Sequence, residues 1–119
     1  MKTILIIDDE KRLIEYLSTV IERKGFRVMT AHTGEEGLEL YKENNPDCVL
    51  LDIHLPEMDG MTVLKKILEI NPKANVYLCT GDDSLELRQK GESLGAKGYL
   101  LKPLDMKIVV EILKGLETS

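Results

Sequence analysis

Acidic and basic side chains directly follow three short apolar runs of this chain. Asp8 and Asp9 follow residues 4–7, Asp52 follows residues 48–51, and Lys102 follows residues 98–101. Continuous apolar runs bounded by polar residues are typical of buried parallel strands, whose carboxyl ends meet at one edge of a sheet. Clustered carboxylates repel one another unless a cation lies among them, and carboxylate oxygens suit Mg²⁺. The sequence therefore predicts a divalent-ion site beside a nucleophilic aspartate.

Strand and helix patterns must alternate to bring these residues to one edge, and they do so five times. The expected strands are 4–7, 26–31, 48–51, 76–79 and 98–101. Apolar residues recur at helical spacing between these strands and after the last one. Such an order predicts one open, doubly wound α/β sheet, because a closed eightfold barrel needs about twice this length.

Local signals place the ends of the helices. Gly25 ends the first helix, and the capping box formed by Thr33 and Glu36 opens the second, which runs to about residue 43. Asp105 caps the last helix, for which we expect one apolar face. That face comprises Ile108, Val109, Ile112, Leu113 and Leu116. The fourth helix has the weakest apolar stripe and an interior glycine, Gly91, so we expect it to be the most loosely held.

Composition restricts the class of protein. The 119 residues fit one domain, residues 1–119, and the 43% hydrophobic and 31% charged content is typical of a globular protein. A net charge of −5 argues against nucleic-acid binding by this domain. No stretch is long enough to span a membrane, and the first strand begins too early to leave room for a signal peptide. We therefore expect a cytoplasmic protein.

Both cysteines fit this compartment. Cys48 and Cys79 each lie inside an apolar run, as reduced core thiols do. A disulfide between them would require neighbouring strands and an oxidising compartment, so we expect free thiols.

The ordered set Asp8-Asp9, Asp52, Thr80 and Lys102-Pro103 resembles the motif of response regulator receiver domains. That family has an acidic pair after the first strand, a phosphoacceptor aspartate after the third, Thr or Ser after the fourth and Lys-Pro after the fifth. Pro56 and Gly60 match the family's loop after the acceptor. The resemblance covers essentially the whole chain. It implies a flavodoxin-like fold with five helices and a five-stranded parallel sheet of order 2-1-3-4-5.

The resemblance also implies a role for each site residue. Asp52 would be the phosphoacceptor, which forms an aspartyl phosphate. Asp9 would bind Mg²⁺ directly and Asp8 through water, while Asp52 and the backbone carbonyl of His54 would supply further contacts. Mg²⁺ is thus the implied cofactor.

Further residues would act on the phosphoryl group or respond to it. Lys102 would meet the phosphate as a point charge, and Thr80 would donate its hydroxyl to a phosphate oxygen. Tyr99 has two interpretations: a core residue, or the family's aromatic switch, which swings inward on activation. Gly60 would be structural, and the Lys102–Pro103 peptide bond would be cis, which aims the lysine into the site.

The implied function is a phosphorylation-dependent switch in two-component signalling. A histidine kinase or a histidine phosphotransfer protein would supply the phosphoryl group. The face made by the fourth helix, last strand and last helix would then rearrange and act on an output domain or a downstream protein. The protein would be a monomer, or a dimer through that face. It would not be an enzyme, although it would take part in its own phosphotransfer and dephosphorylation.

Two alternatives belong to other classes. A haloacid dehalogenase-type phosphatase also uses Asp, Thr or Ser, Lys and Mg²⁺, but it needs a second aspartate two residues after the nucleophile, where this chain has His54. A receiver-like docking module that never takes phosphate is disfavoured by the intact set of site residues.

Two side chains are predicted to set how long the phospho-form lasts. His54 lies two residues after the acceptor and Asp82 two after Thr80, and Gly81 leaves the approach to the phosphorus open. An imidazole changes its charge near neutral pH, so we expect decay of the phospho-form to depend on pH between about 6 and 8. Decay rates of the wild type and His54→Asn across this window test the hypothesis. Parallel, pH-independent rates in both proteins would end it.

Overall fold

One parallel sheet of five strands forms the centre of the molecule, in the order β2-β1-β3-β4-β5. The computed structural model describes residues 1–118. The strands are β1 (Thr3–Ile7), β2 (Arg27–Ala31), β3 (Cys48–Asp52), β4 (Val76–Thr80) and β5 (Gly98–Leu101). Every neighbouring pair is parallel, which confirms the predicted fold and strand order.

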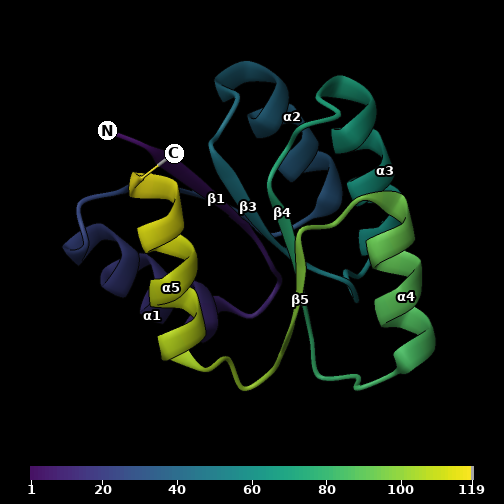
Figure 1. Ribbon diagram of the computed structural model, residues 1–119. Helices are drawn as coiled ribbons and strands as arrows, with labels where there is room; N and C mark the ends of the chain where they lie inside the picture. The colour runs from purple at the N-terminus through teal and green to yellow at the C-terminus, as the bar shows by residue number, and fades with distance from the viewer. Residues whose placement is uncertain (119) are drawn as a thin grey trace.

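Helices cover both faces of this sheet. They are α1 (Lys11–Arg23), α2 (Gly34–Asn44), α3 (Gly60–Ile70), α4 (Leu85–Leu94) and α5 (Met106–Glu117). In Figure 1, α1 and α5 lie on one side of the sheet, and α2, α3 and α4 lie on the other. Within residues 1–118, none of the helices has the length and apolar character needed to cross a membrane.

The apolar runs are continuous because the central strands are buried on both faces. Along β1, Ile4 and Ile6 belong to the cluster that includes α1 and α5 side chains, whereas Leu5 and Ile7 belong to the cluster under α2 and α3. All four side chains are 0–1% exposed. This burial fixes the register, because a slip of one residue would exchange the two sets of side chains. A fixed register in turn fixes where each polar strand end lies.

Several element boundaries differ slightly from those predicted. β3 includes Asp52, because this residue is still in register with Cys79 on β4. β2 begins at Arg27, since the backbone of Phe26 instead donates to the carbonyl of Ile21 at the end of α1. The predicted apolar face of α5 was wrong for one residue: Ile108 is 46% exposed, while its neighbour Val109 is buried.

Among the helices within residues 1–118, α4 has the fewest buried residues, which agrees with its weak apolar stripe. Gly91 is the one buried residue of α4, against three or more in each other helix within residues 1–118. A Cβ at this position would lie 2.5 Å from the Leu78 side chain on β4. The interior glycine therefore weakens the helix pattern but allows α4 to lie against the sheet.

Candidate acidic phosphoacceptor site

Three aspartates meet at the carboxyl edge of the sheet. Asp8 directly follows β1 and Asp52 ends β3, and these strands pair in parallel with Ile7 opposite Leu51. Asp8 and Asp52 are buried, whereas Asp9 is exposed. Each aspartate offers an oxygen, and these atoms all lie within 4.8 Å of one another. The predicted convergence of the three residues is therefore present.

Lys102 brings its ammonium group into this cluster from the end of β5. Its Nζ lies 3.0 Å from Asp8 Oδ2 and 3.5 Å from Asp52 Oδ2. Its backbone N–H donates to the carbonyl of Thr80, at 2.7 Å, and its peptide bond to Pro103 is cis, as the resemblance implied. The lysine is thus anchored at its backbone and at its charged end.

A third carboxylate, which was not predicted from the sequence, completes the contacts of this lysine. Glu10 Oε1 accepts a hydrogen bond from Lys102 Nζ at 2.8 Å. The backbone N–H of Glu10 also donates to Asp8 Oδ1. The position of Glu10 directly after Asp8-Asp9 was the available signal, but an exposed glutamate at the start of a helix has many other roles.

The charges of the site are not balanced by the protein. Burial, and then the Asp8 carboxylate, raise the pKa of Asp52 above its usual value, although the His54 N–H and Lys102 oppose this rise. Burial alone would lower the pKa of Lys102, but its hydrogen bonds to Glu10 and Asp8 hold the net pKa above the usual value. A cation among the aspartates would relieve the remaining repulsion. The all-oxygen donor set fits Mg²⁺.

The loop after β3 orients the acceptor candidate. The backbone N–H of His54 donates to Asp52 Oδ1, at 3.1 Å, while the His54 side chain is exposed. Gly60 begins α3, and its N–H donates to the carbonyl of Ile53 at 2.8 Å. The dependence of decay on pH through His54 stays a prediction.

Thr80 and Tyr99 are connected through one residue of the loop after β4. Thr80 is fully buried, and its Oγ1 accepts a hydrogen bond from the backbone N–H of Asp82 at 3.1 Å. The Tyr99 hydroxyl donates to the backbone carbonyl of the same Asp82 at 2.7 Å. Tyr99 is half-buried, so it is neither a full core residue nor a free surface residue.

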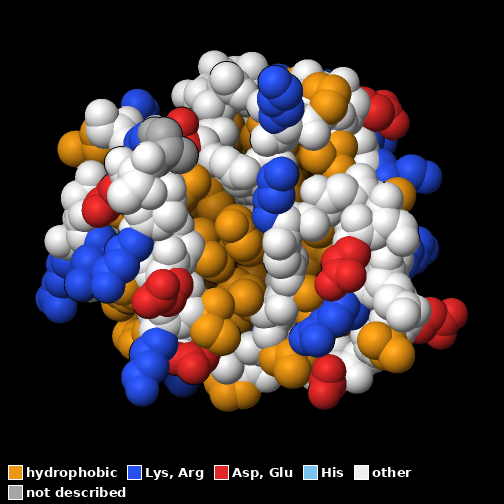
Figure 2. Space-filling view, viewed as in Figure 1, with side chains coloured by type: hydrophobic (Ala, Val, Ile, Leu, Met, Phe, Trp, Pro, Cys, Tyr) orange, Lys and Arg blue, Asp and Glu red, His pale blue; other side chains and the backbone are white. Residues whose placement is uncertain are grey.

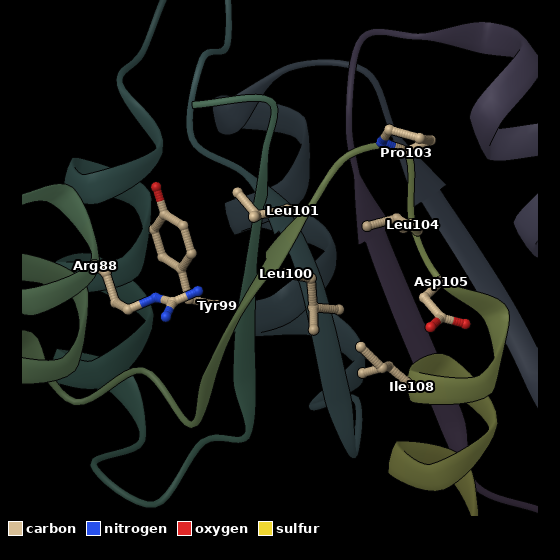
Figure 3. A pocket seen from close by; sticks show the side chains of 8 residues that line it. All are labelled: Arg88, Tyr99, Leu100, Leu101, Pro103, Leu104, Asp105 and Ile108. Carbon is tan, nitrogen blue, oxygen red and sulfur yellow. The ribbon is translucent and has the colours of Figure 1, made fainter. Parts of the chain in front are cut away.

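The side chain of Arg88 on α4 contacts the ring of Tyr99. The guanidinium carbon of Arg88 lies 5.3 Å from the centre of the Tyr99 ring, within the range of cation–π contacts. Figure 3 shows the two side chains together beside Leu101. Arg88 was not predicted from the sequence, because its position beside Tyr99 follows from the packing of α4 on β5.

Comparison with known proteins identifies the family. The sequence model of the family described as "Response regulator receiver domain" matches residues 4–114 of the chain. The chain belongs to this family. Receiver domains are the phosphoacceptor modules of two-component response regulators, so the chain is a regulatory domain rather than a classical enzyme. Membership of the receiver family excludes the alternative of a haloacid dehalogenase-type phosphatase.

Individual receiver relatives agree with this assignment. The chain is 40% identical over 111 residues to the chemotaxis protein CheY of Treponema pallidum (strain Nichols), with 91% of this chain and 77% of CheY covered. It is 39% identical over 113 residues to the transcriptional regulatory protein SrrA of Staphylococcus aureus (strain NCTC 8325 / PS 47). That match covers 95% of this chain but 46% of SrrA, so the chain spans about half the length of such regulators.

A solved receiver structure superposes over the full chain. The BeF3-activated DrrB receiver domain matches with a TM-score of 0.89 and 31% identity, covering 100% of this chain and 99% of that one. The receiver fold is therefore shared along its whole length.

Proposed function

We propose that Asp52 accepts a phosphoryl group from a histidine kinase or a histidine phosphotransfer protein, with Mg²⁺ bound beside it. The observation that carries this proposal is the placement of Asp52. Its buried carboxylate lies beside two further aspartates and one lysine, at the open edge of a parallel sheet. Phosphoryl transfer depends almost entirely on such positioning and charge.

In the proposed step, a carboxylate oxygen of Asp52 attacks the phosphorus of a phosphohistidine. The new O–P bond forms as the N–P bond breaks, and the histidine leaves with the electron pair of that bond. Asp8, Asp9, Asp52 and the backbone carbonyl of His54 would hold Mg²⁺. When bound, the ion offsets the charge of the transferring group.

Two side chains would then receive the phosphoryl oxygens. Lys102 supplies a charged donor beside Asp52. Thr80 Oγ1 accepts from Asp82, so its own hydroxyl hydrogen remains a donor for the phosphate. Because Asp82 also holds Tyr99, a shift of Thr80 would disturb the contacts of that switch candidate.

The face of α4, β5 and α5 is the proposed output of this change. A cavity of about 270 Å³ lies there, lined in part by Tyr99, Leu104 and Ile108 (Figure 3). Leu101 and Ile108 expose apolar surface on this face. Figure 2 shows apolar side chains gathered between α5 and β5. We propose that a downstream protein, an output domain or a second copy of the chain binds this face when Asp52 is phosphorylated.

The extent and location of the domain are further parts of the proposal. Residues 1–119 form one receiver domain in this proposal, which is supported by the single five-stranded sheet that carries both apolar clusters within residues 1–118. Cys48 and Cys79 are free and buried, and burial raises the pKa of each thiol to about 12. We propose a cytoplasmic location, in which such buried thiols would stay reduced.

Magnesium is expected to stabilise the protein through Asp9. Addition of Mg²⁺ should raise the midpoint of thermal unfolding, because the ion binds the folded cluster and relieves its repulsion. Asp9→Asn should weaken Mg²⁺ binding by about tenfold or more, since it removes one charged ligand. Titration of the midpoint with Mg²⁺ measures this effect.

A variant with the same change of net charge controls that titration. Glu22→Gln removes one negative charge from the last turn of α1, and its Mg²⁺ affinity should equal that of the wild type. Equal affinities in Asp9→Asn and Glu22→Gln would contradict the assignment of Asp9 as a ligand.

A further inference from the structure

The three carboxylates around Lys102 differ in how firmly they are held. The side chains of Asp8 and Asp52 are 4% and 6% exposed, and each lies at the end of a central strand. The Glu10 side chain is 58% exposed, although its contact with Nζ is the shortest of the three. Glu10 is therefore the partner that can move into water at the lowest cost.

An ammonium group has three N–H donors, and Lys102 has three carboxylate partners. Asp52 is the most distant of the three, and phosphorylation converts its carboxylate into the acyl phosphate, so a phosphoryl oxygen has to draw Nζ inward against the pull of Asp8 and Glu10. Asp8 cannot release the lysine easily, because its other oxygen is bound to the backbone N–H of Glu10 and its side chain is buried. The exposed Glu10 carboxylate is the partner that a phosphoryl oxygen can replace.

Resting on the function proposed above, we propose that Glu10 is a positioning residue that exchanges with the phosphoryl group for Lys102. Before phosphorylation, Glu10 holds the ammonium at the mouth of the site. On phosphorylation, the phosphoryl oxygen takes the donor, and the Glu10 carboxylate turns into water. Glu10 thus competes with the phosphoryl group, and it sets how readily the site accepts one.

Replacement of Glu10 by glutamine separates this competition from simple support of the lysine. Glutamine keeps the length and an acceptor oxygen but loses the charge that competes for Nζ. With Mg²⁺ present, Glu10→Gln should bind beryllofluoride, a phosphoryl analogue, about fivefold more tightly than the wild type, as expected for loss of one partly exposed ion pair. Its phosphorylation by acetyl phosphate should be faster by a similar factor.

A double-mutant cycle tests whether Glu10 acts through Lys102. In the Lys102→Met background, Glu10→Gln should leave beryllofluoride affinity unchanged, because the ammonium for which the two groups compete is absent. Glu22→Gln carries the same change of net charge away from Lys102 and should stay within about twofold of the wild type. Nuclear magnetic resonance titration of the full chain measures each affinity.

The outcomes distinguish this inference from the proposed function. If the wild type takes up neither beryllofluoride nor a phosphoryl group, the proposed function fails. If the wild type takes up both while Glu10→Gln binds equally or more weakly, the exchange is overturned. A fivefold gain that persists in the Lys102→Met background would also overturn it, since the effect would then be a general charge effect.

Discussion

Asp52→Asn is expected to yield no phospho-form at all when the protein is treated with acetyl phosphate and Mg²⁺. Asparagine has nearly the same shape as aspartate, but its amide is not a nucleophile that can form an acyl phosphate. The wild type should gain the mass of one phosphoryl group. Intact-mass spectrometry measures the difference, and a full mass shift in Asp52→Asn would refute the assignment.

Loss of folding will not explain that result. Because burial and Asp8 raise the pKa of Asp52, the folded state binds its proton more tightly than the unfolded state does. The stability of the wild type therefore falls as pH rises from the pKa of Asp52 in the unfolded state through its pKa in the folded state. Asparagine carries no charge and avoids this cost at neutral pH. Without Mg²⁺, Asp52→Asn should unfold a few degrees higher, by roughly 2–5 °C. Exposed Asp83→Asn is the control, and it should be phosphorylated normally.

Gly60→Ala should be the most destabilising single-methyl change at the site. A Cβ there would overlap the carbonyl oxygen of Asp52, and it would lie 2.5 Å from Ile53 Cα and 2.8 Å from the Ile53 carbonyl oxygen. These are backbone atoms, which cannot rotate away as a side chain can. We expect a loss of about 3 kcal/mol or more in the free energy of unfolding, measured with urea.

Another glycine of the chain supplies the matched control. A Cβ on Gly115, inside α5, would meet nothing within 4 Å. Gly115→Ala should therefore stabilise the protein by about 0.5–1 kcal/mol, the usual helix preference for alanine. Similar effects of both substitutions on the free energy of unfolding would show that close packing does not explain the need for glycine at position 60.

The sequence predicted the strands and the convergence of the aspartates because both depend on burial. Apolar runs that are covered on both faces must lie in the middle of a sheet, and parallel strands bring Asp8 and Asp52 to one edge. The cis bond before Pro103 came from the family resemblance instead, since most bonds of this type are trans.

Contacts between side chains far apart in the chain were not predictable. Glu10 and Lys102 are separated by 92 positions, and their pairing depends on how α1 and the end of β5 are placed. The contact of Arg88 with Tyr99 likewise depends on the packing of a helix on a strand. The exposure of Ile108 shows the same limit, because helical spacing does not tell how wide a face the neighbouring elements cover.

Asp82 makes its contacts with Thr80 and Tyr99 through main-chain atoms, so these contacts do not depend on the side chain at this position. Its main-chain N–H binds Thr80, and its main-chain carbonyl binds Tyr99. Every amino acid except proline has both groups. The side chain at position 82, which we propose to tune the lifetime of the phospho-form, can therefore diverge between descendants while the proposed connection from Thr80 to Tyr99 stays intact.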